Sequence, residues 1–396
     1  MSQRHNPNAD LTVVYSSDPA DGVRRITEAM APFAGLSSDA NVVIKPNLVV
    51  SRTKWLGANT RPEVVEALIV ALRERGVERI TVADGSGMGE SATRAFGICG
   101  YDEIARKHGV RLVDIEHDDF IERKTRSKGP FSRLRISRTV AECDFLINVP
   151  LIKAHGQTRV TCSLKNLKGV MPRRSKTSFH LHDTERAIAQ LGEVVTPDFI
   201  LVDGTYGDVS SELGGNPVNI GIIAGGYDPL ALDCFAATTL GFSPQEIKHI
   251  AHYARARGVD LESFEPRIHK LNSPSGATVF EADRGDLSRY RSTVHAGNVC
   301  STCWGNLRFA LERLRKARLL ERSDHYFIGR NAVERLAGND ERRGGSSSKQ
   351  WMVAVGDCAR SELTAASGAE SDTEITIAGC PPRAEAIVSA VRGAKR

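Results

Sequence analysis

The sequence has no long apolar run and only a small excess of positive charge. No stretch approaches the roughly twenty apolar residues of a membrane-spanning helix, and residues 1–10 are polar, without the apolar core of a signal peptide. Aromatic residues make up 6% of the chain, and 53 basic residues face 48 acidic ones. We therefore expect a cytoplasmic protein that binds neither membrane nor nucleic acid. Its eight cysteines are then expected to be thiols or metal ligands, not structural disulfides.

Strand-like and helix-like segments alternate between residues 40 and 258. This alternation predicts an α/β fold with a doubly wound, largely parallel sheet. Because right-handed crossovers place the strand–helix loops of such a sheet on one edge, we expect those loops to face one cleft. The five loops carry Lys45, Asp84, Lys153, Asp203 and Gly225.

Composition and pattern divide the chain into three parts. Residues 1–10 read as a disordered tail. Residues 11–295 are predicted to form an α/β ligand-binding domain, in which the alternation weakens from about residue 260 into a linker. Residues 296–396 are predicted to form a second, smaller C-terminal α/β domain that carries a cysteine cluster.

Residues 151–172 form a basic segment, punctuated by glycines, directly after a buried strand. Open α/β sheets place their ligand sites at this position, although a solvated basic loop is the alternative. Lysine binds anions as a point charge, and histidine can transfer a proton near neutral pH. The predicted catalytic residues are Lys153, His155 and Lys165, and the predicted substrate-binding residues are Lys45, Asn47, Arg61, Asp84, Asn166, Lys168 and Asp203. For the lysines the alternative is ordinary surface charge, and for His155 it is a hydrogen-bonded structural role.

Two further motifs have two interpretations each. The glycine-rich turn at 84–89 suits phosphate binding through backbone N–H groups, or it is simply a tight turn. His180 and His182 could ligate a metal, whereas Asp183 is better explained as a helix cap.

Four cysteines in the last hundred residues carry the most specific pattern. Cys300 and Cys303 form a Cys-x-x-Cys pair, and Cys358 and Cys380 each follow a predicted strand. Four thiolates in turns, two of them beside glycine, favour an iron–sulfur cluster. Structural zinc and four unrelated buried thiols are the alternatives.

The segment Gly379-Cys380-Pro381-Pro382-Arg383, with Gly356-Asp357-Cys358 before it, resembles the cluster-binding end of the small subunits of nickel–iron hydrogenases and respiratory complex I. The resemblance covers about forty residues. It implies a [4Fe–4S] cluster whose last ligand comes from the Gly-Cys-Pro-Pro turn.

A second resemblance covers about 215 residues of the first domain. The motifs occur in the order Lys45-Pro46-Asn47-Leu48, Asn59-Thr60-Arg61-Pro62, Asp84-Gly85-Ser86, Lys153-Ala154-His155, Ser163-Leu164-Lys165-Asn166-Leu167-Lys168-Gly169, Asp203-Gly204 and Asp228-Pro229-Leu230-Ala231-Leu232-Asp233. They resemble the family catalogued as domain of unknown function 362. That resemblance implies an iron–sulfur protein with a redox role, although the usual ferredoxin-type run of four close cysteines is replaced here by a dispersed set.

The first half is also similar to the nickel-dependent lactate racemase family. Thr60-Arg61-Pro62 opens a helix as in that family. However, Ala58 stands where the family has an aspartate, and Gly85-Ser86-Gly87 replaces its histidine-bearing turn. The resemblance therefore implies a related fold and argues against racemase chemistry.

Together these patterns predict a [4Fe–4S] oxidoreductase that passes single electrons to a small anionic substrate. No flavin or nicotinamide site is recognisable, so an external donor such as ferredoxin is expected. A non-catalytic electron carrier or assembly partner, and a redox-neutral isomerase or lyase with a structural cluster, are the alternatives. A homodimer is compatible with the sequence.

Overall fold

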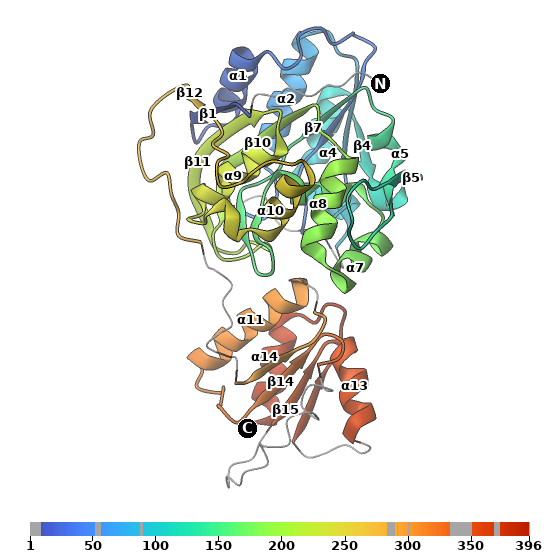
Figure 1. The fold of residues 1–396 in the computed structure, drawn as a ribbon, viewed down its shortest axis with the longest axis vertical. Coiled ribbons are helices and arrows are strands. Elements are labelled where there is room, and N and C mark those ends of the chain that lie inside the picture. Colours follow the sequence, from blue (N-terminus) through green and yellow to red (C-terminus); the bar gives the residue numbers. More distant parts are fainter. Residues whose placement is uncertain are drawn as a thin grey trace. The chain divides into compact units, whose positions relative to one another are not determined.

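The computed structural model describes residues 9–51, 57–87, 90–282, 290, 292–299, 301–332, 351–367 and 373–395. The chain forms two compact units (Figure 1). The larger unit comprises residues 1–179 and 183–284, and the smaller comprises 180–182 and 285–396. None of the helices in the described part has the length and apolar character needed to cross a membrane.

The larger unit is built on an eight-stranded sheet with the order β12-β1-β11-β10-β7-β2-β3-β4. Its strands from β10 to β4 are parallel to their neighbours, which confirms the largely parallel sheet. The strands are β1 (Leu11–Tyr15), β2 (Asn41–Lys45), β3 (Arg79–Asp84), β4 (Arg111–Asp114), β7 (Phe145–Asn148), β10 (Phe199–Asp208), β11 (Pro217–Gly226) and β12 (Ile268–Lys270).

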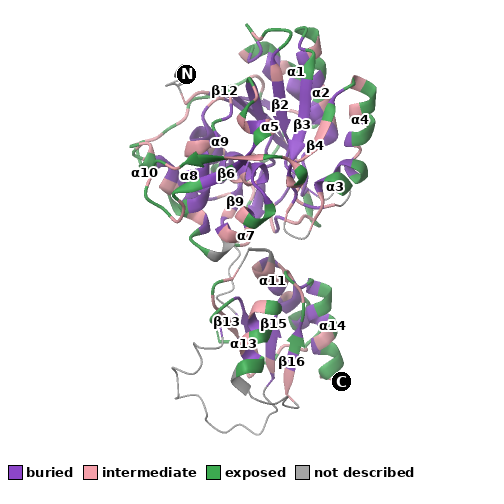
Figure 2. Cartoon of the chain, turned by 90° about the vertical axis from the view of Figure 1, so that its right-hand side faces the viewer, coloured by how far each residue is buried: buried purple, intermediate pink, exposed green. Residues whose placement is uncertain are grey.

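Helices cover both faces of this sheet, so its central strands are apolar on both sides. Val42 and Ile44 of β2 pack on one face, and Val43 between them packs on the other. Figure 2 shows the resulting buried strands between more exposed helices. The first face is covered by α1 (Pro19–Met30), α2 (Pro62–Glu74), α3 (Ala92–Cys99) and α4 (Tyr101–His108), and the second by α8 (Thr184–Val194), α9 (Pro229–Thr239) and α10 (Lys248–Ala256).

The basic segment after β7 is more ordered than a loop. It forms a small hairpin of β8 (Lys153–His155) and β9 (Arg159–Thr161), followed by a short helix α6 (Ser163–Asn166). A second hairpin, β5 (Phe120–Lys124) with β6 (Arg133–Ser137), leads into α5 (Arg138–Ala141), and α7 (Arg173–Leu181) precedes α8.

Two details differ from expectation. β11 runs antiparallel to β10, and Gly225 pairs with Leu201 near the start of β10. Gly225 therefore lies at the opposite edge from the loops after β2 and β3, and the expectation of five loops on one edge was wrong for this loop. The antiparallel turn arises because β10 and β11 are joined by a short connection without a crossover helix.

The smaller unit has a four-stranded sheet, β13-β14-β15-β16, in which all neighbours are parallel. Its strands are β13 (Val294–Ala296), β14 (His325–Ile328), β15 (Met352–Val355) and β16 (Glu374–Ile377). α11 (Ser301–Lys316) and α14 (Ala384–Ala394) pack on one face, and α13 (Asp357–Ser367) packs on the other. This confirms a second, smaller α/β domain with a parallel sheet.

Candidate functional site

The carboxyl ends of three neighbouring strands bring polar side chains together in the larger unit. Lys45 ends β2, Asp84 ends β3, and Asn148 ends β7. Lys45 Nζ lies 2.6 Å from Asp84 Oδ1, and both side chains are buried. Burial lowers the pKa of Lys45, and the Asp84 carboxylate opposes that shift. The predicted grouping of Lys45 with Asp84 thus exists as an internal ion pair.

The surrounding backbone fixes this ion pair from both sides. Asp84 Oδ2 accepts a hydrogen bond from the Leu48 backbone N–H at 2.7 Å. Lys45 Nζ also donates to the Pro46 carbonyl at 2.9 Å and to Asn166 Oδ1 at 3.3 Å. The charge of Lys45 is therefore neutralised inside the fold by Asp84. This favours a structural role for Lys45, in which it holds the loops of the site in place.

Two asparagines connect α6 to the sheet edge. Asn166 Nδ2 donates to Asn148 Oδ1 at 2.8 Å, and Asn148 Nδ2 donates to the carbonyl and hydroxyl of Ser163 at 3.1 Å each. Asn148 was not among the predicted residues. Asn148 can be identified from the sequence because it is a polar residue at the end of an otherwise apolar strand. That strand, β7, ends at the same sheet edge as β2 and β3.

Asn47, Arg61 and Asp203 link the loop before α2 to β10. Asn47 Nδ2 donates to the Ala58 carbonyl at 2.7 Å. The Arg61 backbone N–H donates to Asp203 Oδ2 at 2.9 Å, while the Arg61 guanidinium lies 5.6 Å from the centre of the Tyr206 ring. Burial raises the pKa of Asp203, and the hydrogen bond from the Arg61 N–H opposes that shift.

Lys153 and Lys165 differ from Lys45 because neither has a carboxylate within ion-pair distance in the described part of the chain. Lys153 Nζ is almost fully buried and donates to the Ala58 carbonyl at 2.5 Å. Burial, reinforced by the neighbouring Lys165 charge, lowers the pKa of Lys153 to about 7. Burial likewise lowers the pKa of Lys165 to about 8. Two amines therefore change charge near neutral pH at one place, which suits anion binding and proton transfer.

His155 is held in one orientation beside these amines. Its Nδ1 accepts hydrogen bonds from the backbone N–H groups of Gln157 and Thr158, both at 3.1 Å. The neutral ring therefore carries its proton on Nε2, which lies 3.8 Å from Glu212 Oε1. Glu212 also accepts from the Gly156 N–H at 3.3 Å. Sequence reasoning missed Glu212. The sequence feature that points to it is its position, as an acidic residue in the turn after the strand that carries Asp203.

Lys168 and Asp183 make contacts within the fold, and other candidates fall outside the described residues. Lys168 Nζ lies 5.8 Å from the centre of the Phe179 ring. Asp183 caps α8 by accepting from the Arg186 N–H at 3.1 Å, as its alternative interpretation predicted. The side chain of His180, residues 88–89 of the glycine-rich turn, and Cys300 lie outside the described residues.

In the smaller unit the cysteines follow the carboxyl ends of parallel strands. Cys303 lies in the first turn of α11, after β13, and Cys358 is the second residue of α13, after β15. Cys380 follows β16. Because β13, β15 and β16 point the same way, these segments all emerge at one edge of the sheet.

Hydrogen bonds tie the three cysteine-bearing segments to one another. The Gly379 N–H donates to Asp357 Oδ1 at 2.9 Å, and the Asp357 N–H donates to the Gly379 carbonyl at 3.2 Å. Asn306 Nδ2, one turn beyond Cys303, donates to the Pro382 carbonyl at 2.8 Å. Cys358 and Cys380 directly follow the linked residues Asp357 and Gly379, and Cys303 lies three residues before Asn306.

Among the described residues, no three His, Cys, Asp or Glu side chains converge as ligands of one metal ion. Gly356 and Gly379, with φ of 88° and 124°, adopt backbone conformations that a side chain would strain.

Comparison with known proteins gives a curated relative and several distantly similar solved structures. A thylakoid-associated protein of Synechocystis sp. is 27% identical over 221 residues, which is 54% of this chain and 67% of that protein. A crystal structure from Thermotoga maritima shows 12% identity, coverage of 47% and 51% of the two chains, and a TM-score of 0.33. The lactate racemase apoprotein from Thermoanaerobacterium thermosaccharolyticum shows 14% identity, coverage of 55% and 54%, and a TM-score of 0.28.

The chain therefore spans about half the length of each of these two solved structures, and neither likeness is close enough to transfer a fold or an activity. A family model covers most of the motifs of the larger unit. Residues 42–238 match the model of the family described as Domain of unknown function (DUF362).

Proposed function

We propose that this chain is an iron–sulfur reductase. The smaller unit would hold a [4Fe–4S] cluster on Cys300, Cys303, Cys358 and Cys380, and the larger unit would hold a small anionic substrate. The observation that carries the proposal is the placement of three cysteine-bearing segments at one sheet edge, joined by the Asp357–Gly379 and Asn306–Pro382 hydrogen bonds. When bound, such a cluster supplies electrons one at a time.

The substrate half of the proposal rests on Lys153, His155 and Lys165. An anion that binds near the two amines would favour their charged forms and so raise both pKa values toward the ordinary range of lysine. Lys165 would then hold the anion, while Lys153 and the Nε2–H of His155 would supply protons. Reduction of one double bond of the substrate needs two electrons and two protons, with the electrons drawn from an external low-potential protein such as a ferredoxin.

A redox-neutral isomerase or lyase is the second candidate. It is favoured by one observation, the burial of Lys153 without a carboxylate at ion-pair distance among the described residues. That burial lowers the pKa of Lys153 to about 7, and a neutral amine can remove a proton from carbon next to a carboxylate. The cluster would then be structural. Activity that persists without any reductant would identify this candidate.

We also infer a cytoplasmic location. The Synechocystis relative is thylakoid-associated by name, so peripheral association with a membrane is the alternative for this chain. Fractionation of cells at low and high salt separates the two, because a peripheral protein is recovered in the membrane pellet at low salt and released at high salt.

The proposal is tested by electron paramagnetic resonance of anaerobically purified, dithionite-reduced protein. We expect a [4Fe–4S] signal in the wild type that is lost or altered in Cys358→Ser and Cys380→Ser. Cys143→Ser is the matched control, because Cys143 lies in the larger unit and its thiol donates to the Val140 carbonyl. Lys153→Met should keep the signal and lose turnover. Equal signals in all the cysteine variants would contradict the proposal.

A further inference from the structure

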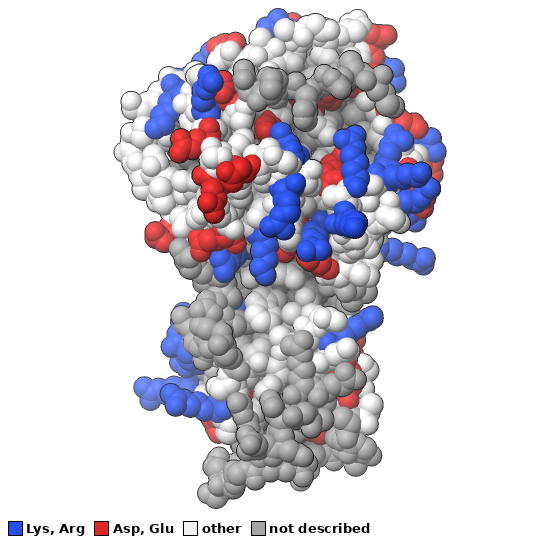
Figure 3. All heavy atoms as spheres, in the orientation of Figure 1, with Lys and Arg blue, Asp and Glu red and all other residues white. Residues whose placement is uncertain are grey.

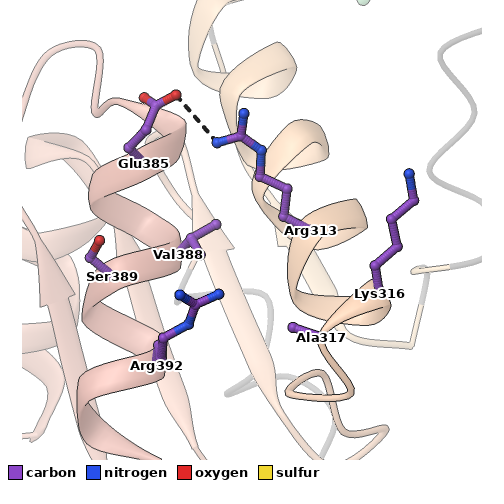
Figure 4. Close-up of a pocket in the computed structure, with 7 residues that line it drawn as sticks. All are labelled: Arg313, Lys316, Ala317, Glu385, Val388, Ser389 and Arg392. Carbon is purple, nitrogen blue, oxygen red and sulfur yellow. Dashed lines mark hydrogen bonds and ion pairs between the residues drawn. The ribbon is translucent and has the colours of Figure 1, made fainter.

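The smaller unit has a groove between α11 and α14 with a volume of about 510 Å³. Its lining residues are Arg313, Lys316, Ala317, Glu385, Val388, Ser389 and Arg392. In Figure 4 Val388 and Arg392 extend from α14 toward α11, and a dashed line joins Arg313 to Glu385. Figure 3 shows basic side chains on both flanks of this unit, with more of them on the left. The groove thus has a small apolar floor between cationic walls.

The positive charge of the groove is only partly compensated. Arg313 Nη1 lies 3.3 Å from Glu385 Oε1, with both side chains more than half exposed. Lys316 and Arg392 form no ion pair with any residue that the structure describes. Two cations on two different helices therefore face one groove without a carboxylate partner. An acidic group from another molecule would complete the arrangement.

The exposure of the lining decides between a small ligand and a macromolecule. Small-molecule sites bury most of their ligand and fix it with a few enclosed polar groups. Here Val388 is the one buried lining residue, and the charged groups all lie in solvent. The groove therefore fits carboxylate side chains that project from the surface of a partner protein.

We propose that this groove anchors the acidic surface of an electron-donor protein, an inference that rests on the redox function proposed above. Lys316 lies thirteen residues beyond Cys303 on α11, about 20 Å along the helix axis. A donor of about 100 residues has a radius of gyration of about 13 Å and is wide enough to cover both the groove and the cysteine edge. The other end of the groove, at Glu385, is five residues from Cys380.

An anionic membrane is a less suitable occupant. Basic segments that bind anionic lipid gather four to eight Lys and Arg residues, whereas this groove has two unpaired cations and is concave. Transient electron-transfer complexes, by contrast, are small and electrostatically steered.

The test measures binding of a strongly acidic plant-type ferredoxin to the full chain at low ionic strength. The double variant Lys316→Glu/Arg392→Glu should raise Kd by about tenfold and weaken its salt dependence, because two attractive contacts become repulsive. Arg106→Glu is the matched control, since Arg106 is likewise exposed in the last turn of a helix, α4 of the larger unit. We expect it to bind as the wild type does.

Three outcomes would overturn the inference. These are equal Kd values in the double variant and the wild type, no ferredoxin binding by the wild type, and groove-dependent binding to phosphatidylserine vesicles in place of ferredoxin. Iron and sulfide are measured in the same preparations, so the two proposals can fail separately. A cluster without groove-dependent binding would refute only the docking surface, and groove-dependent binding without a cluster would refute only the redox function.

Discussion

Lys45 and Asp84 form an ion pair of 2.6 Å at the ends of two neighbouring strands, and neither side chain reaches solvent. Removal of one partner leaves the other charge buried and uncompensated, which typically costs about 3–5 kcal/mol. We expect Asp84→Asn to lower the denaturation midpoint of the larger unit markedly. The double variant Lys45→Met/Asp84→Asn should lose less stability than the sum of the two single variants. Chemical denaturation of all three proteins measures this coupling, and additive losses would contradict it.

Gly169 lies directly against this ion pair. A Cβ at this position would stand 2.6 Å from Lys45 Nζ and would also collide with Asp84 Oδ1. Gly169→Ala should therefore lower the melting temperature of the larger unit. Gly276→Ala is the control, because a Cβ there meets no atom within 4 Å. A melting temperature unchanged in both variants would show that the ion pair tolerates displacement.

Lys153 should make the stability of the larger unit depend on pH. Its folded-state pKa of about 7 lies below the ordinary lysine value of 10.5, so the unfolded chain binds more protons between these two values. Unfolding free energy from this group therefore rises with pH from about 7 to 10.5, by at most about 1.4 kcal/mol per pH unit. Lys153→Met should remove this part of the slope. Parallel pH profiles of the two proteins would be inconsistent with a neutral buried amine.

Asp357 connects the segments of Cys358 and Cys380 through Gly379. We expect Asp357→Ala to lower the iron retained by the protein after gel filtration with a chelator, because the two segments lose their mutual anchor. Thr364→Ala, on the same helix, removes a hydroxyl that donates within α13, to the Arg360 carbonyl. It should retain iron as the wild type does, and equal losses in both variants would argue for a general effect on the helix.

The architecture could be predicted because local patterns determine it. The alternation of apolar strands and amphipathic helices specified the largely parallel sheet. The order of β10 and β11 could not be predicted in the same way. Their antiparallel pairing follows from the short connection between Asp208 and Pro217, and that connection is short only because both strands extend beyond their apolar segments.

The residues of the polar site were predicted more successfully than their interaction partners. Lys45 and Asp84 were expected in one cleft, but their mutual neutralisation depends on burial that no local pattern reveals. Glu212 and His155 are 57 positions apart in sequence, and their approach depends on a hairpin that reads as a loop. Thr60, which looks like a helix cap, instead donates to the Val149 carbonyl of a neighbouring loop.

The central claim is that Cys300, Cys303, Cys358 and Cys380 hold a [4Fe–4S] cluster. Its most direct test is elemental analysis of the full chain, purified without oxygen, for iron, acid-labile sulfide and zinc. We predict about four iron and four sulfide per chain, with both lost in Cys358→Ser and retained in Cys143→Ser. Stoichiometric zinc without iron or sulfide would contradict the claim.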